Sequence, residues 1–395
     1  MKFIKITWYS LILVFFIAGL YSGRREFFLL FFIMLFVVLY ALALNLWTAF
    51  SFSFIQELSL PAVIKGSLAY IKTGIYNDKP FPFTLMKIRV ETVSPRDIYE
   101  LDFNLSPKSN IDYNIPLSCP YRGVYHVGMT TIEINDVFGL VKSRFDMRRL
   151  PYYRQCSVKI LPRLVELPYL PTRNTDSKYS GGVALRLAED GDSYADLRRY
   201  RPGDPLKRVH KPVSARKREL YVKNYDIPLE TTVLIAIDPT MDIGEGEDKR
   251  YLADVACECA VAVAEISMRS GFTVEFAGID ISRSNKRKRK QEILTAVCDA
   301  LAELPFNGKG DFAYEVESAL ARAQGVRAAY IISSNSPAYF ANAFYRLKQE
   351  GCHVCLLKVT GAESKHENDD IIQGVSYISV SPGDDIREIL TGENQ

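Results

Sequence analysis

Residues 232–238 read Thr232-Val233-Leu234-Ile235-Ala236-Ile237-Asp238, a continuous apolar run that ends in a carboxylate. A short run without polar alternation is typical of a strand that is buried on both faces, as in a parallel sheet covered by helices. Ligands of such sheets bind beside the carboxyl ends of the strands. Asp238 follows this strand directly, so it is the first candidate for a functional site.

The sequence after Asp238 alternates between helix and strand patterns. We expect helices at 249–271, 291–304, 312–323 and 339–349, strands at 272–279, 329–332 and 353–359, and two closing elements at 375–380 and 385–390. Strands that alternate with helices of this length predict a doubly wound α/β domain with a parallel sheet. We place this domain at 229–395.

Two uncharged apolar runs, 6–21 and 27–47, lie near the N-terminus on either side of Gly23-Arg24-Arg25-Glu26. A bilayer core needs about 20 apolar helical residues, which the second run supplies and the first nearly supplies. We therefore predict a transmembrane helical hairpin at 1–50. A signal peptide that starts with Lys2 and Lys5 is the alternative for the first run. It is disfavoured because no clear cleavage site follows and a full span comes next.

The orientation of this hairpin rests on a small charge bias. Lys2, Lys5 and Lys65 on one side compete with Arg24 and Arg25 in the turn. The seven cysteines are an odd number spread over a long chain, which does not resemble a disulfide framework. We therefore expect a multi-pass protein of the cell membrane with its soluble domains in the cytoplasm.

The middle of the chain changes to short segments rich in β-branched and aromatic residues. Strands are expected at 84–92, 98–105, 123–134 and 156–161, with breaks at Asn77-Asp78, Ser94-Pro95, Ser106-Pro107 and Cys119-Pro120. Strands at this spacing predict a small antiparallel β-sandwich, which we place at 51–170. It contains no catalytic set, so a spacer is the simplest interpretation.

Two stretches carry a family pattern. The first contains Tyr121-Arg122-Gly123-Val124-Tyr125, Asp136-Val137-Phe138-Gly139-Leu140 and Leu161-Pro162-Arg163; the second contains Asp196-Leu197-Arg198-Arg199-Tyr200-Arg201-Pro202-Gly203-Asp204-Pro205, Ser214-Ala215-Arg216 and Glu219-Leu220-Tyr221-Val222-Lys223. Together they resemble the bacterial domain of unknown function 58 family. Val137 stands where that family usually has proline, and Lys211-Pro212 stands where it usually has Trp-Lys.

The resemblance extends to the two-helix anchor and covers essentially the whole chain. It implies a von Willebrand factor A-like domain after the second stretch. It also implies a partner, because such proteins are similar to those paired with MoxR-type AAA+ ATPases. The family has no established biochemical activity.

The second stretch lies in a joining segment, 171–228, that is rich in basic residues. The candidate binding residues are Arg198, Arg199, Tyr200, Arg201, Gly203, Asp204 and Arg216. One interpretation is a cationic docking surface for a carboxylate-rich partner or a phosphate group. The other is structural: Arg198 and Arg216 pair with Asp196, Asp204 or Glu219 and hold the two domains together.

A metal site is the second candidate. Domains of the A type commonly bind Mg²⁺ through Asp-x-Ser-x-Ser, and this chain has Asp238-Pro239-Thr240-Met241-Asp242. Asp311 is a further candidate ligand, whereas Ser333-Ser334-Asn335 stands where the last aspartate of such a site is expected. Alternatively, Asp238 and Asp242 only cap the following loop and helix.

Other chemistry finds no support in the sequence. The cysteine pairs Cys352/Cys355 and Cys257/Cys259 lack a second pair of zinc ligands, and the chain has neither a nucleophile elbow nor a phosphate-binding loop. The basic run at 283–290 has no interleaved aromatics, so we predict a solvated loop and no nucleic acid. We expect a non-enzymatic, membrane-anchored interaction or scaffold protein. The alternatives are a metal-dependent hydrolase that uses the Asp238 loop and a purely structural envelope protein.

Overall fold

The computed structural model describes residues 2–94, 97–136, 139–150, 153–171, 196–201, 209–224, 232–241, 247–279, 281, 290–307, 311–323, 325–360, 375–381 and 383–391. The chain divides into two compact units, Met1–Ile160 and Leu161–Gln395. Residues 161–170, which the sequence groups with the β-rich part, therefore belong to the second unit.

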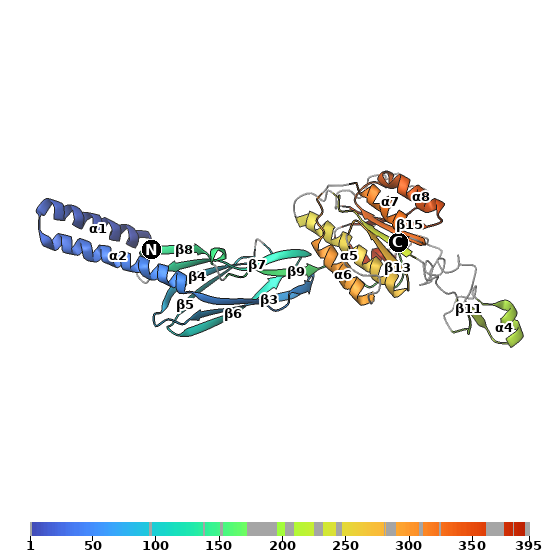
Figure 1. Ribbon diagram of the computed structural model, residues 1–395, viewed down its shortest axis with the longest axis horizontal. Helices are drawn as coiled ribbons and strands as arrows, with labels where there is room; N and C mark the ends of the chain where they lie inside the picture. The colour runs from blue at the N-terminus through green and yellow to red at the C-terminus, as the bar shows by residue number, and fades with distance from the viewer. Residues whose placement is uncertain are drawn as a thin grey trace. The chain divides into compact units, whose positions relative to one another are not determined.

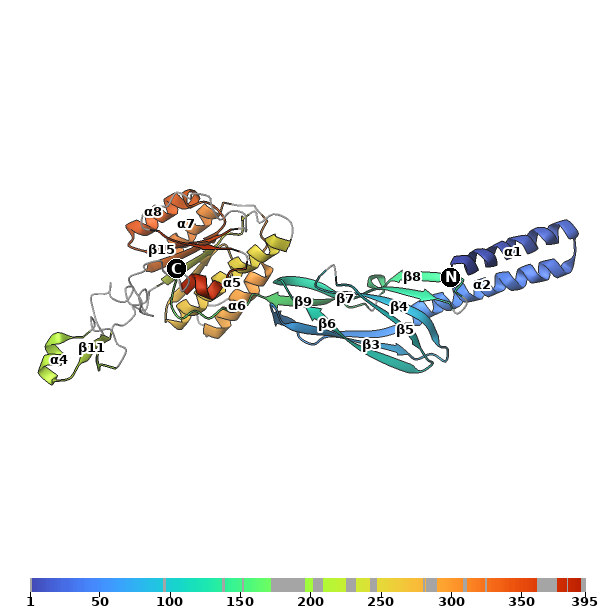
Figure 2. The ribbon, with the colours of Figure 1, turned by 180° about the vertical axis from the view of Figure 1, so that it is seen from behind.

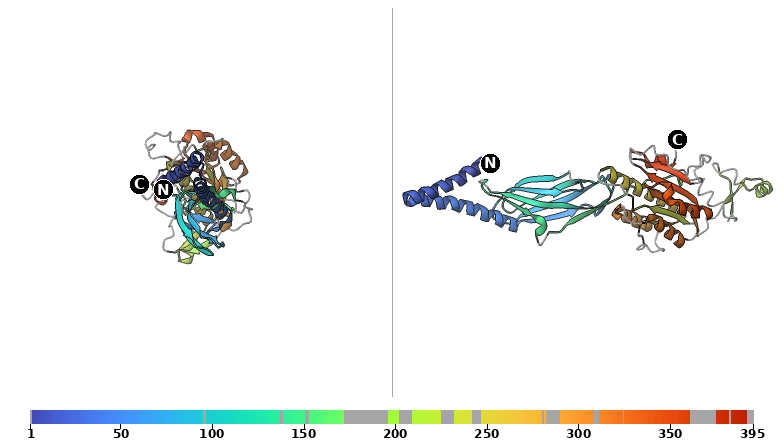
Figure 3. Two further views of the ribbon diagram at one scale, coloured as in Figure 1. Left: turned by 90° about the vertical axis from the view of Figure 1, so that its left-hand side faces the viewer. Right: turned by 90° about the horizontal axis from the view of Figure 1, so that it is seen from above.

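The first unit begins with two antiparallel helices, α1 (Lys2–Ser22) and α2 (Arg25–Ser51). Gly23 lies between them at φ +66°, a left-handed conformation that suits glycine. Figure 3 shows the two helices as a hairpin. Both helices are long and apolar enough to cross a membrane, and only 6% of each apolar window is buried. A core helix of a soluble protein buries most of its apolar side chains, so the pair suggests a membrane anchor.

Two antiparallel sheets follow the hairpin (Figure 2). Their strands are β1 (Ser53–Leu58), β2 (Ala62–Ile64), β3 (Leu68–Asn77), β4 (Phe83–Glu91), β5 (Tyr99–Leu105), β6 (Ser109–Ser118), β7 (Gly123–Asn135), β8 (Lys142–Asp146) and β9 (Cys156–Leu161), with a 3-10 turn, η1, at Met147–Arg149. One sheet has the order β1-β3-β6, and the other has β2-β9-β7-β4-β5 with β8 on β7. Buried side chains of both sheets form one core, in which Ile71 and Ile115 come from the first sheet and Ile88 and Val158 from the second.

The second unit contains a parallel sheet of order β13-β12-β14-β15-β16. Its strands are β12 (Thr232–Ile237), β13 (Thr273–Ala277), β14 (Val326–Ser333), β15 (His353–Val359) and β16 (Ser376–Val380), and its helices are α5 (Glu247–Arg269), α6 (Lys290–Glu303), α7 (Phe312–Arg322), α8 (Ala341–Gln349) and α9 (Ile386–Thr391), with a 3-10 turn, η3, at Pro337–Phe340. The predicted α/β region is thus confirmed, and its sheet is consistent with a Rossmann-like or A-like domain.

Helices cover both faces of this sheet (Figure 1). Alternate residues of β12 divide between two cores: Ile235 packs with α5 and α6, whereas Leu234 packs with α7 and α8. This division explains why β12 has no polar alternation.

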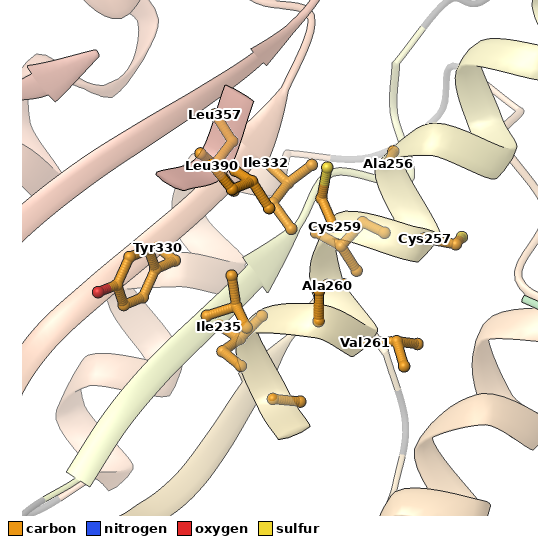
Figure 4. Close-up of a cluster of buried hydrophobic side chains, with 14 of the residues drawn as sticks. Ile235, Ala256, Cys257, Cys259, Ala260, Val261, Tyr330, Ile332, Leu357 and Leu390 are labelled. Atoms are coloured by element: carbon orange, nitrogen blue, oxygen red, sulfur yellow. The ribbon is translucent and has the colours of Figure 1, made fainter. Parts of the chain in front are cut away.

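The alanine-rich helix α5 lies close against the sheet (Figure 4). Cys259 points toward Ile332 of β14, whereas Cys257 points away from the sheet. The Sγ atom of Cys257 lies 3.9 Å from the carbonyl oxygen of Leu301 in α6. Residues two apart on a helix diverge, so these two thiols serve two different packing contacts.

The basic joining segment has its own small sheet. Strands β10 (Asp196–Arg199) and β11 (Tyr221–Asn224) pair in antiparallel fashion, and helix α4 (Lys211–Lys217) precedes β11. Val209 adds one isolated bridge to Val222, whose side chain is buried.

Candidate functional site

The switch point of the parallel sheet lies between β12 and β14. Strand β12 is second in the sheet order although it comes first in the sequence, so the chain leaves it toward β13 on one side and returns to β14 on the other. Crevices at such points are the usual ligand sites of open α/β sheets. Asp238 follows β12 at this point, and Ser333 is the last residue of β14.

Four hydrogen-bond donors surround the carboxylate of Asp238, which is fully buried. Its Oδ1 accepts bonds from the backbone N of Thr240 at 2.9 Å and from the Thr240 hydroxyl at 2.6 Å. Its Oδ2 accepts bonds from the Ser333 hydroxyl at 2.6 Å and from Asn335 Nδ2 at 2.9 Å. A carboxylate offers about four lone-pair positions, so all of them are used.

This arrangement bears on the magnesium hypothesis. Direct coordination by Asp238 requires the loss of at least one of its four hydrogen bonds. Among the residues that the structure describes, no three His, Cys, Asp or Glu side chains gather as metal ligands. Asp311 accepts a bond from the backbone N of Tyr314 and caps α7, while Asp242 lies outside the described residues. These groups fit a hydrogen-bonded closure of the switch point better than a metal shell, and the metal site stays a prediction.

The second candidate site lies on the small sheet of the joining segment. Arg199 and Tyr221 are directly opposed across β10 and β11. Arg199 Nη2 lies 3.0 Å from Glu219 Oε2, and both side chains are exposed. A hydrogen bond with Tyr221 and the negative charge of Glu219 raise the pKa of Arg199. Lys217 Nζ lies 4.7 Å from the centroid of the Tyr221 ring, a cation–π contact.

Helix α4 is attached to this sheet through Ser214, whose side chain is buried. Ser214 Oγ accepts a hydrogen bond from the backbone N of Tyr221 at 2.9 Å. His210 begins the helix, since its Nδ1 accepts from the backbone N of Val213 at 3.3 Å. Pro212 follows in the first turn, where its fixed φ favours the start of a helix.

The predicted binding residues are placed as follows. Arg198 is the neighbour of Arg199 on β10 and is paired with Val222 of β11. Its side chain projects from the other face of the strand than that of Arg199. The backbone N of Tyr200 donates to the carbonyl oxygen of Leu220 at 2.8 Å and extends the ladder. Arg201 and Arg216 are exposed. Gly203 and Asp204 lie outside the described residues.

Three contributors to this surface lie outside the seven candidate binding residues, although Lys217 belongs to the predicted basic surface and Glu219 was considered as an ion-pair partner. Glu219 is the ion-pair partner of Arg199, Lys217 covers the Tyr221 ring, and Ser214 fixes the strand. The position of Ser214 could have been predicted from the sequence, because Pro212 in His210-Lys211-Pro212 marks a helix that starts at Lys211, three residues before Ser214. The register that opposes Arg199 to Tyr221 has no comparable signal.

Comparison with known proteins places both candidate sites within the residues that match one family model. The parallel sheet with a polar switch point defines an α/β domain of the Rossmann-like kind. Residues 196–349 match the family model described as Protein of unknown function DUF58. The chain thus carries a DUF58 family domain that begins at β10 and ends with α8, less than half of its 395 residues. No curated protein matches the chain.

Proposed function

We propose that this chain is a membrane-anchored, non-enzymatic interaction or scaffold protein. Its basic joining segment, 171–228, here called the signature segment, docks onto an acidic surface of a protein partner. The observation that supports this proposal is the position of Arg199 on β10, opposite Tyr221, whose ring is in contact with Lys217. Arg216 is exposed on the adjoining helix α4. The basic residues of the segment whose side chains the structure describes are Arg198, Arg199, Arg201, Lys211, Arg216, Lys217 and Arg218, against the acidic Glu219.

Arginine supports this role for a geometric reason. Its planar guanidinium presents a fixed fork of donors that matches a carboxylate, and it is more weakly hydrated than an ammonium group. Arg199 already pairs with the carboxylate of Glu219 on the surface, so an incoming carboxylate can replace that partner without burial of a new charge. Exposed ion pairs contribute only about 0 to 1 kcal/mol, so this exchange costs little.

The partner that we propose is a MoxR-type AAA+ ATPase, on the strength of the family resemblance. We further propose that the α/β domain is A-like, that the antiparallel sheets form a sandwich that acts as a spacer, and that the soluble parts face the cytoplasm. All seven cysteines are free thiols, which supports a reducing compartment. The apolar hairpin supports attachment to the cell membrane.

A metal-dependent hydrolase at Asp238 receives less support. Such an enzyme needs a ligand with free lone pairs and a base that activates water. The Asp238 carboxylate already accepts four hydrogen bonds, and its neighbours Thr240, Ser333 and Asn335 supply donors.

The test is a pull-down of the full-length, detergent-solubilised protein from its native membrane, with ATP or ADP present. Arg216→Glu reverses one exposed charge of the signature segment. Arg346→Glu makes the same change on the exposed face of α8, away from that segment in sequence, and serves as the matched control. We expect an AAA+ ATPase to copurify with the parent and with Arg346→Glu but not with Arg216→Glu.

Two results contradict the proposal. Recovery of the ATPase with all three proteins shows that the signature segment does not bind it. Absence of any ATPase in both nucleotide states removes the family-based partner. Equal thermal unfolding midpoints of both variants are required, because a loss caused by unfolding says nothing of docking.

A further inference from the structure

The loop between β3 and β4 presents an aromatic side chain next to helix α2. Phe81 lies between Pro80 and Pro82 and is 52% exposed. Its ring centroid is 6.2 Å from that of Trp47, edge to face, and Trp47 is itself 57% exposed. The pair therefore joins a loop of the β-rich region to the apolar hairpin while leaving both rings accessible.

A buried asparagine at the end of β3 holds this loop in shape. Asn77 Nδ2 donates to the carbonyl oxygens of Phe81 at 2.8 Å and Ser106 at 3.0 Å. Asn77 Oδ1 accepts from the backbone N of Lys79 at 3.1 Å, and the backbone N of Lys108 donates to the carbonyl oxygen of Lys79 at 3.2 Å. The exposed ring of Phe81 is thus carried by an ordered turn.

The hairpin is also hydrogen-bonded to the turn between β7 and β8. Tyr9 of α1 donates from its hydroxyl to the carbonyl oxygen of Leu140 at 3.3 Å. Asn45 of α2, which is buried, donates from Nδ2 to the carbonyl oxygen of Val141 at 3.3 Å. Because both helices contact one turn, the depth of the hairpin in a bilayer determines the position of the β-rich region.

The length of α2 gives that depth. Asn45 and Trp47 lie about 30 and 33 Å along the helix from Arg25, at 1.5 Å per residue. A bilayer core is about 30 Å thick. When Arg25 lies at one membrane surface, Trp47 reaches the opposite interface, where tryptophan is enriched. Phe81, in contact with Trp47, lies at the same level.

We infer that the loop 78–82 lies in the interfacial layer of the lipid bilayer and inserts Phe81 beside Trp47, so that this end of the β-rich region rests on the membrane. A lipid surface is the occupant because the exposed ring is continuous with the apolar hairpin. Lys79 and Lys108 exceed Asp78 by one positive charge, which suits a lipid headgroup layer. The inference rests on the proposed membrane anchoring but not on the partner of the signature segment.

The experiment uses tryptophan fluorescence of the full chain in vesicles of three parts phosphatidylcholine to one part phosphatidylglycerol. Trp8→Phe and Trp47→Phe remove both native tryptophans. Phe81→Trp then reports on the loop. Tyr70→Trp is the matched control. Tyr70 is exposed on β3, which leads into the loop, and lies about 23 Å from Asn77 at the loop end of that strand, at 3.3 Å per residue. Phosphatidylcholine with brominated chains is the quencher.

We expect strong quenching and a blue-shifted emission at position 81 and little of either at position 70. Equal, weak quenching at both positions overturns the inference when flotation shows that the vesicles carry the protein. A protein that fails to float contradicts the anchoring itself. The pull-down of a partner is independent of both readouts, so each failure can be assigned.

Discussion

Asn335 Nδ2 donates a 2.9 Å hydrogen bond to Asp238 Oδ2 and so joins the loop after β14 to the end of β12. The Ser333 hydroxyl donates to the same oxygen at 2.6 Å and accepts from the backbone N of Asn335 at 3.0 Å. The three side chains close the switch point of the sheet. Their first role is to hold two adjacent strands in register where the helical connections diverge.

Asp238→Asn should therefore destabilise the α/β domain. The new amide group brings a donor to a place where Ser333 and Asn335 also donate, and an unsatisfied buried polar group costs about 1 to 3 kcal/mol. For a domain of this size, each kcal/mol lowers the unfolding midpoint by about 2 to 4 °C. Thermal unfolding in detergent measures the change. Glu350→Gln, at an exposed helix end, is the control that should leave the midpoint unchanged.

Gly278→Ala should be more damaging. A Cβ at Gly278 comes 1.8 Å from the carbonyl oxygen of Ile237, the residue before Asp238, and φ is +82°. The backbone of β12 or β13 must move, so we expect a loss of several kcal/mol or failure to fold. Gly351→Ala provides the comparison, because Gly351 also has a positive φ, +73°, but no atom within 4 Å of its Cβ. It should lose only about 1 to 2 kcal/mol. Similar losses for the two variants contradict the close approach.

Asn77→Ala should loosen the loop that carries Phe81. The change removes the side chain that bonds to backbone groups of Lys79, Phe81, Leu105 and Ser106. We expect a loss of about 1 to 3 kcal/mol and faster hydrogen exchange of the Lys79 amide. Asn104→Ala, exposed on β5, should change neither quantity.

The sequence predicted most closely the strands that are buried on both faces. Strands β12 and β15 have the predicted bounds because both faces are buried and the apolar run is continuous. Strands β3 and β6 were not among the strands predicted, and both carry exposed polar residues, Lys72 in β3 and Asp112 and Asn114 in β6.

The candidate sites show the same limit. Asp238 was predicted as a site residue and Ser333-Ser334-Asn335 as a later loop of the same site, but the sequence did not predict the hydrogen bonds that Ser333 and Asn335, 95 and 97 residues away, donate to Asp238. Likewise, Arg198 and Arg216 were the examples given of arginines that pair with an acid, and the ion pair between Arg199 and Glu219 was not predicted. The pairing of Arg199 with Glu219 depends on the register of β10 on β11, which the sequence did not predict.

The buried thiols predict a loss of stability in alkali. Burial raises the pKa of Cys355 to about 12 and that of Cys298 and Cys352 to about 11. Below pH 8.5, the usual thiol pKa, thiols are protonated in the folded and the unfolded chain, and their contribution is constant. Above it the unfolded chain releases these protons first, so stability falls as the pH rises toward 11 or 12.

Cys355→Val tests this prediction. The variant removes one buried thiol at similar volume, and its unfolding midpoint should fall less than that of the parent between about pH 8 and pH 11. The difference corresponds to up to about 3 kcal/mol at the upper end. Parallel curves for the two proteins contradict an alkaline effect of Cys355, whatever their midpoints at pH 8.

Glu219→Gln separates docking from a structural role of Arg199. The Arg199–Glu219 pair is exposed on both sides, so its loss should change stability by less than about 1 kcal/mol. It also frees the Arg199 guanidinium for an incoming carboxylate. If the signature segment docks an acidic partner, Glu219→Gln should therefore retain or increase the recovery of that partner, with a steeper dependence on salt. Arg199→Glu, which reverses the charge at the same pair, should abolish recovery. Loss of the partner in both variants instead assigns the Arg199–Glu219 pair a structural role. In that case the complex requires the intact ion pair and not a free guanidinium.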